Sequence, residues 1–371
     1  MAVLIGLGMV MLYSSSMNME IGKNQAAVGA HLLLSQLCWC AIGLIGCLAA
    51  AALDYRRLKK AAPWLLGVSL LLLALVFAPV IGIARNGAHR WIGLAGPHFQ
   101  PSELAKLALI LFLASYGDRF QRQMAGFRKG LLLPGVIIAA VLALIFIEPD
   151  RGCTILLAAV CGVMLILAGA RLRFIVPPAM LLVAGLAVSL LHDSMRLTRI
   201  HAWLHPEECK DGVGYQAYEA MIALGSGGWT GLGLGNGRQK LGFVPEHHTD
   251  FIFSIIGEEL GLVATLAVVL LFIALVVCGF YVARRSSDAF GLLLGAGITS
   301  MIGLQAFINM GVVTSMLPNK GMPLPFISYG GSNLVLMLVS VGLLLSISRF
   351  AAEPVKPKSN PFETMPEPCH A

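Results

Sequence analysis

The feature that most constrains this chain is a series of long apolar segments separated by short polar ones. Hydrophobic residues occupy 57% of the 371 positions and charged residues only 12%, against about 25% charged in ordinary soluble domains. A helix needs about 20 apolar residues to span a membrane. Seven segments come close to this length or exceed it: 31–53, 61–84, 131–147, 152–170, 174–191, 261–283 and 289–317.

Three weaker apolar segments, 1–15, 102–116 and 331–348, complete the alternation of sides that the connecting loops require. The sequence therefore predicts an all-α polytopic membrane protein with about ten transmembrane helices. Its first helix is short and looks truncated. We expect one transmembrane domain over 1–350 and a disordered, proline-rich cytoplasmic tail over 351–371.

Basic residues in every second connection orient the predicted bundle. Lysine and arginine favour cytoplasmic loops, and here they cluster at 56–60, 119–129, 171–173 and 284–285. Both termini are then cytoplasmic, and a large extracytoplasmic loop, 192–250, lies between the seventh and eighth helices. The net charge of +7 follows from this topology, so it gives no argument for a nucleic-acid partner.

Polar residues concentrate at the outer ends of the predicted helices. They occur in RNGAHRWIGLAGPHFQPSELAK at 85–106, EPDRG at 148–152, the loop 192–250 and LPNKGMPLPFISYGGSN at 317–333. A charge at bilayer depth costs about 2.5 kcal/mol or more, so such groups usually line a cavity. We expect a polar chamber that opens outward.

Asp250 lies in the stretch PEHHTDFIFSIIGEELG at 245–261, where the long loop meets the eighth helix. At 100° per residue, Glu258 shares the face of Asp250 and Glu259 points nearly opposite. A rise of about 1.5 Å per residue places Glu258 about 12 Å deeper. Asp250 is then an N-cap, a carboxylate at the chamber floor that acts as base or nucleophile, or both.

Other polar groups have structural and functional interpretations that the residues leave open. Lys106 is one turn from Glu103 and either pairs with it or holds Asp250 ionised across the chamber. His247 and His248 lack the spacing of a zinc site. The glycine-rich stretch GSGGWTGLGLGNG at 225–237 lacks the preceding strand of a dinucleotide site, so it is expected to be irregular backbone.

Five motifs in order make the chain similar to the SEDS (shape, elongation, division, sporulation) family. They are RWIGLAGPHFQPSELAK, EPDRG, GYQAYEAMIALGSGGWTGLGLGNGRQK, PEHHTDFIFSIIGEELG and LPNKGMPLPFISYGG. HHTDFIFSIIGEELG and PNKG resemble the division protein FtsW or its sporulation relative more than the elongation protein RodA. The resemblance covers nearly the whole chain apart from the tail and the short first helix.

The resemblance implies a peptidoglycan glycosyltransferase that polymerises lipid II, releases undecaprenyl pyrophosphate and works with a class B penicillin-binding protein and other divisome proteins. It implies a location in the bacterial inner membrane at the division septum. The essential aspartate of the family falls on Asp250, the expected general base. Division-type sequences often carry an acid eight residues earlier; this chain has Gly242, and Glu246 is the candidate substitute.

Binding of a pyrophosphate requires cations, because guanidinium groups bind phosphate in pairs of hydrogen bonds and ammonium groups act as point charges. The candidate contacts to pyrophosphate or sugar are Arg90, Lys106, Arg199, Lys240, Glu246, His248, Lys320 and Ser328. No cofactor is assigned, and Mg²⁺ or Mn²⁺ is a candidate without a defined site.

Two other functional classes remain open on the sequence. Polar groups inside a helical bundle also suit a transporter that flips lipid II across the membrane. A non-catalytic scaffold of cell division is the third class. Polymerisation by the purified chain and by an Asp250→Asn variant separates the three.

Overall fold

The computed structural model describes residues 1–17, 25–78, 82–85, 88–93, 98–191, 194–205, 207–208, 212, 214–241 and 248–351. Glu246, His247 and the tail 352–371 lie outside the described residues, and so do the expectations that rest on them. Each segment that the sequence assigns to the membrane contains a helix, although not every helix spans the whole segment: α1 (Ala2–Met17), α2 (Gln25–Ala52), α3 (Tyr55–Leu75), α4 (Pro101–Arg119), α5 (Leu133–Ile147), α6 (Arg151–Leu167), α7 (Leu172–Leu191), α10 (Ile252–Arg284), α11 (Ala289–Val313) and α12 (Gly331–Ala351).

Seven helical segments in the described ranges are long and apolar enough to cross a membrane. They are Leu32–Ala52, Tyr55–Leu75, Arg128–Ile147, Leu172–Ser189, Ile252–Arg284, Ala289–Val313 and Gly331–Phe350. The helices α1 and α6 are shorter, with apolar stretches Ala2–Ser15 and Arg151–Leu167, and α4 carries four charged residues. The polytopic helical architecture is confirmed, and the count of ten spans stays a prediction.

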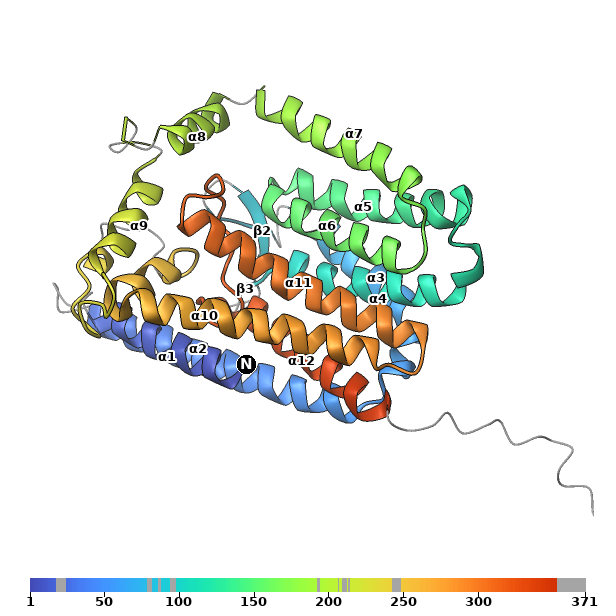
Figure 1. Ribbon diagram of the computed structural model, residues 1–371, viewed down its shortest axis with the longest axis horizontal. Coiled ribbons are helices and arrows are strands. Elements are labelled where there is room, and N and C mark those ends of the chain that lie inside the picture. Colours follow the sequence, from blue (N-terminus) through green and yellow to red (C-terminus); the bar gives the residue numbers. More distant parts are fainter. Residues whose placement is uncertain are drawn as a thin grey trace, which may run out of the picture.

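The helices run side by side, and the connections gather at two opposite ends (Figure 1). One end holds the small strands, α8 (Ser194–Leu204), α9 (Tyr215–Ser226) and the loop that follows α11. The basic connections meet at the other end, where Lys59 pairs with Asp118 and Arg56 Nη2 donates to Ser287 Oγ at 2.8 Å. The grouping of these connections agrees with the alternation that the basic residues predict.

A three-stranded antiparallel sheet lies where the sequence suggested the end of a helix. The apolar run 61–84 was expected to continue as one helix, but α3 ends at Leu75 and β1 (Gly82–Arg85) begins a meander with β2 (Ala88–Gly93) and β3 (His98–Phe99). Gly82 pairs with Ile92, and Ile92 pairs with Phe99. An apolar run alone does not distinguish strand from helix. The sheet matters because Arg90 lies on β2.

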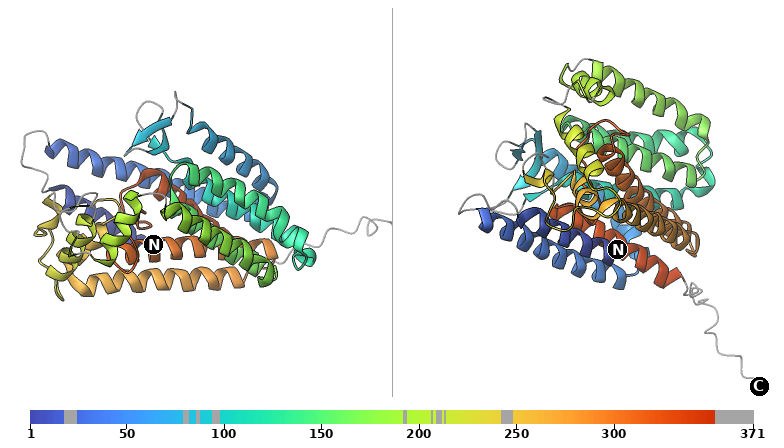
Figure 2. Two further views of the ribbon diagram at one scale, coloured as in Figure 1. Left: turned by 90° about the horizontal axis from the view of Figure 1, so that it is seen from above. Right: turned by 60° about the vertical axis from the view of Figure 1, so that its left-hand side comes forward.

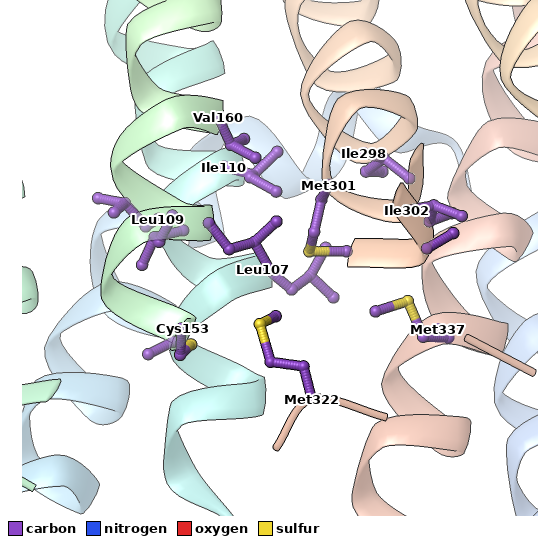
Figure 3. Packing of buried hydrophobic residues seen from close by; sticks show 14 of the residues in the cluster. Leu107, Leu109, Ile110, Cys153, Val160, Ile298, Met301, Ile302, Met322 and Met337 are labelled. Atoms are coloured by element: carbon purple, nitrogen blue, oxygen red, sulfur yellow. The ribbon is translucent and has the colours of Figure 1, made fainter. Parts of the chain in front are cut away.

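The apolar core is centred on α4, α6, α11 and α12. Figure 3 shows Leu107 and Ile110 of α4 near Met301 of α11, with Met322 directed toward them from the loop after α11. Met322 is 4% exposed, and Leu324, Phe326 and Ile327 that follow it in the loop are also buried. Burial of a methionine side chain contributes about 1.5–3 kcal/mol. The core thereby anchors the loop that carries Lys320 and Gly321.

Figure 2 shows the same bundle from two further directions, with the sheet at the edge of one end in both. The long connection between α7 and α10 also lies at this end. The helix α10 is interrupted at Gly261, which has φ 76° and ψ −174°. Such a conformation is open to glycine and costly for other residues, so the kink is fixed by the sequence.

Candidate active site

Asp250 occupies the turn that leads into α10, one residue before the cap residue Phe251. The N-cap residue of α10 is Phe251, so the interpretation of Asp250 as the N-cap residue is wrong. The backbone of Asp250 is held from α11, where Asn309 Nδ2 donates to the Asp250 carbonyl at 2.8 Å and to the Met322 carbonyl at 2.6 Å. One amide side chain thus joins the turn before α10 to the loop after α11.

The loop after α11, residues 314–330, passes directly against the Asp250 carboxylate. A Cβ atom built on Gly321 would lie 2.5 Å from Asp250 Oδ2, closer than any ordinary contact. Only a glycine backbone leaves room for the carboxylate here. Lys320 is the preceding residue in the chain, and the charged groups that act on its ammonium are Arg151 and Asp150.

A buried polar network supports the loop from below. Lys106 Nζ donates to Glu103 Oε1 at 2.9 Å and to Gln305 Oε1 at 3.0 Å, and Gln305 Nε2 donates to the Pro323 carbonyl at 3.0 Å. Asn333 Nδ2 donates to Glu103 Oε2 at 3.1 Å. These contacts favour the structural pair of Lys106 with Glu103. The alternative pair of Lys106 with Asp250 remains a prediction, as does a substrate contact.

The EPDRG segment, residues 148–152, packs beside the loop after α11, where a Cβ atom on Gly152 would lie 3.0 Å from Met322 Sδ. Arg90 Nε donates to the Glu148 carbonyl at 3.1 Å and Arg90 Nη2 to the Pro149 carbonyl at 2.7 Å. Asp150 caps α6, with its Oδ1 accepting from the Cys153 N–H at 3.0 Å. Burial lowers the pKa of Lys320, nearby Arg151 lowers it further, and Asp150 opposes the shift. EPDRG and the loop after α11 are therefore electrostatic neighbours.

Lys240 does not line an open anion site. Its ammonium is 0% exposed and pairs with Glu259 Oε1 at 2.5 Å, and it also donates to Ser14 Oγ at 3.2 Å. Ser14 Oγ in turn donates to Glu259 Oε2 at 2.6 Å. Glu259, which was predicted to point away from Glu258, is thus paired with Lys240. Lys240 is enclosed, and the structure favours a structural role over the predicted pyrophosphate contact.

Glu258 fastens the segment directly after the glycine-rich stretch to α10. Its Oε1 accepts from the backbone N–H groups of Arg238 at 2.7 Å and Gln239 at 3.2 Å. The backbone of Gly231 approaches so closely that a Cβ there would lie 2.2 Å from the Glu259 carbonyl. The expectation of irregular backbone packed on the bundle is confirmed. The carboxylates of Glu258 and Glu259 hold this backbone by accepting hydrogen bonds from Arg238 N–H and Gly235 N–H.

Of the remaining predicted substrate contacts, His248 and Ser328 lie at or in the loop after α11, and Arg199 lies on α8. Tyr329 N–H donates to the His248 carbonyl at 3.0 Å, so His248 lies against the loop after α11. Ser328 Oγ accepts from the Leu324 N–H at 2.8 Å and thereby closes a turn of the same loop. Arg199 is exposed on α8, a helix that reaches the 315 region through Trp203 Nε1 and the Ser315 carbonyl at 2.8 Å.

Three residues of this region were not identified from the sequence: Gln305, Asn309 and Gly321. Gln305 and Asn309 are four residues apart on one face of an otherwise apolar helix, and polar groups at membrane depth mark functional interiors. That spacing was the available signal. Gly321 gave none, because its importance depends on a contact between segments 71 positions apart.

Metal coordination was not assigned by the structure. Within the described ranges, no group of three or more histidine, cysteine, aspartate or glutamate side chains is placed to hold an ion. Mg²⁺ needs only one or two carboxylates when substrate phosphates supply other ligands. The Mg²⁺ or Mn²⁺ expectation therefore stays a prediction.

Comparisons with known proteins agree with this architecture over almost the full length. A family model described as "Cell cycle protein" (FtsW/RodA/SpoVE) matches residues 1–353. The chain is 42% identical over 345 residues to the probable peptidoglycan glycosyltransferase FtsW of Trichlorobacter lovleyi, covering 93% of this chain and 90% of that protein. It is 37% identical over 348 residues to stage V sporulation protein E of Bacillus subtilis, covering 94% of each.

Two solved structures share the fold and substantial sequence. A chain described under "Structural coordination of polymerization and crosslinking by a peptidoglycan synthase complex" superposes with a TM-score of 0.74 at 29% identity, covering 95% of this chain and 99% of that one. The rod shape determining protein RodA of Thermus thermophilus gives 0.68 at 28% identity, with 95% of each chain covered.

Proposed function

Because this chain belongs to the FtsW/RodA/SpoVE family of cell cycle proteins, we propose that it is a membrane glycosyltransferase that polymerises lipid II into peptidoglycan strands, with Asp250 as general base. Relatives named peptidoglycan glycosyltransferase support the activity. The observation that carries the role of Asp250 is the close approach of the Gly321 backbone to its carboxylate, together with the bond from Asn309 to its carbonyl.

The reaction joins two lipid-linked disaccharides. The 4-hydroxyl of the acceptor GlcNAc attacks the anomeric carbon of the donor MurNAc, the new glycosidic bond forms, and the bond to undecaprenyl pyrophosphate breaks. A sugar hydroxyl is a weak nucleophile at neutral pH, and a positioned base that takes its proton contributes about 10²–10⁴-fold. Asp250 receives that proton, and a single displacement inverts the anomeric centre.

The surroundings of Asp250 serve to fix its position and to balance charge. Asn309 and Gly321 restrict where the carboxylate can lie, which matters because small misplacements of reacting groups are costly. The leaving pyrophosphate gathers negative charge, and preorganised cations stabilise it. The cations proposed for this role are Lys320, next to Gly321 in the chain, and Arg90 of β2, which donates to the Glu148 and Pro149 carbonyls.

The setting is proposed to be the division septum of the bacterial inner membrane, with both termini in the cytoplasm. A class B penicillin-binding protein would supply the crosslinking step, in line with a structural relative that belongs to a complex coordinating polymerisation and crosslinking. Names of relatives favour division, and the sporulation relative at 37% identity keeps a sporulation role as the second candidate.

The test compares wild type with Asp250→Asn, each purified with the transpeptidase partner, in glycan-strand formation from lipid II. We expect polymer from the wild type and a loss of about 10²-fold or more in the variant, with equal thermal stability of both. Glu207→Gln, an exposed carboxylate of the outer loop, is the matched control. A wild type that translocates lipid II in vesicles and makes no polymer would instead establish the flippase.

A further inference from the structure

The Glu148 carboxyl is an unusual group in the outer part of the bundle. Glu148 is 1% exposed, and among the described residues neither carboxyl oxygen has a hydrogen-bond partner. A buried polar group without a partner costs about 1–3 kcal/mol, and an ionised one costs far more. A carboxyl held in this way suggests that its partner is a ligand.

Charged groups of both signs lie near this carboxyl, and the two that act on it directly are Asp150 and Arg90. Arg90 donates to the Glu148 and Pro149 carbonyls, and Lys320 interacts electrostatically with Arg151 and with Asp150. Asp150 is the nearest carboxylate that acts on Glu148, and it caps α6. The region thus holds three cations, Arg90, Arg151 and Lys320, and the Asp150 carboxylate already accepts a backbone hydrogen bond. Such a set of charges suits an anionic ligand better than a metal cation.

We propose that Glu148 is a binding group for the substrate's pyrophosphate, donating its carboxyl O–H to an anionic phosphate oxygen. This inference rests on the proposed function and extends it by naming a ligand contact that carries no positive charge. A protonated carboxyl can make such a bond, whereas a carboxylate would repel the phosphate.

The protonation state at neutral pH agrees with a donor. Burial and the Asp150 carboxylate raise the pKa of Glu148 to about 8, and Arg90 opposes the shift. The group is therefore neutral at pH 7 and loses its proton above about pH 8. Cys153, whose environment includes Glu148, Asp150, Lys106 and Glu103, is the remaining titratable neighbour.

The affinity for pyrophosphate should then fall with rising pH. With a pKa of about 8, the neutral fraction drops from about 0.9 at pH 7 to about 0.1 at pH 9, so the apparent Kd rises about tenfold. Lys320, whose pKa is lowered, also loses charge in the alkaline direction. Only the part of the pH dependence that depends on Glu148 tests the proposal.

The experiment measures binding of undecaprenyl pyrophosphate to the purified full chain in detergent at about pH 7 and pH 9. Glu148→Gln keeps a neutral N–H donor at the same place and cannot ionise. It is expected to bind within about threefold of wild type at pH 7 and to lose the tenfold Glu148-dependent weakening at pH 9. Glu148→Ala is expected to bind about tenfold more weakly at pH 7. Glu207→Gln should follow the wild type.

Several outcomes would overturn the proposal. One is a Glu148→Gln variant with the full alkaline weakening of the wild type, and another is a folded Glu148→Ala variant with unchanged affinity. Thermal unfolding establishes folding, and Glu148→Gln keeps the test valid if the alanine variant unfolds. A wild type that does not bind the lipid pyrophosphate overturns the assignment, while glycan-strand formation by the same preparation would leave the proposed function standing.

Discussion

Replacement of Gly321 by alanine tests directly whether the position of the Asp250 carboxylate controls the rate. The added Cβ would lie 2.5 Å from Asp250 Oδ2 and 3.5 Å from its Cγ. Carbon–oxygen contacts normally begin at about 3.3 Å, so the carboxylate or the loop must move by about 0.8 Å. Misplacement of about 1 Å costs up to about 10²-fold in rate. We expect a fall in kcat of about 10–10²-fold.

The assay is initial-rate polymerisation of lipid II over a range of concentrations, so that kcat and KM separate. Gly330→Ala is the matched control in the same loop, because its nearest neighbour would be Asn333 Cβ at an ordinary 3.7 Å. We expect near wild-type rates from that variant. A folded Gly321→Ala enzyme with kcat within about twofold of wild type would refute the argument that backbone contact positions the base.

Three further predictions concern stability. Asn309→Leu leaves two backbone carbonyls without their donor, at about 1–3 kcal/mol each, so the thermal unfolding temperature should fall; an unchanged value would contradict the bridging role. Lys240→Met leaves the buried Glu259 uncompensated, at about 3–5 kcal/mol, and adding Glu259→Leu should restore much of the unfolding temperature. The folded chain retains the Glu148 proton up to about pH 8, whereas the unfolded chain releases it near pH 4.5, so stability falls with rising pH by up to about 1.4 kcal/mol per unit between these values. Glu148→Gln should flatten that fall in pH-dependent unfolding scans, and an unaltered slope would argue against a buried neutral carboxyl.

The helical architecture was accessible from the sequence because membrane spans are long and apolar, and that signal is strong in each segment taken alone. The sheet at 82–99 was missed for the same reason. An apolar run carries no information on whether Ile83 belongs to a helix or a strand, and β2 and β3 depend on pairing between segments. Asp250 could be selected from its position just before α10, at the predicted outer end of that helix, and from its motif context.

Sequence periodicity did not predict which groups the individual charged side chains contact. Helical phase placed Glu258 below Asp250, but the first turn begins only at Ile252, and Glu258 accepts from the backbone N–H groups of Arg238 and Gln239. Lys240 looked like an anion contact because it lies in an outer polar loop. Its ion pair with Glu259 is set by tertiary packing, which no local pattern encodes.

The contact that joins Ser14, Lys240 and Glu259 also sets an order of events during synthesis. Ser14 and Glu259 are 245 positions apart, so α1 is synthesised long before its polar partner exists. Two carboxylates then arrive together on α10, and each would cost about 2.5–3.5 kcal/mol at the centre of a bilayer. The segment translated just ahead of them brings Lys240, which donates to Glu259, and the Arg238 and Gln239 N–H groups, which donate to Glu258. Insertion of α10 is thus coupled to the folding of the loop that precedes it, and a slowly folding loop would delay completion of the bundle at this helix.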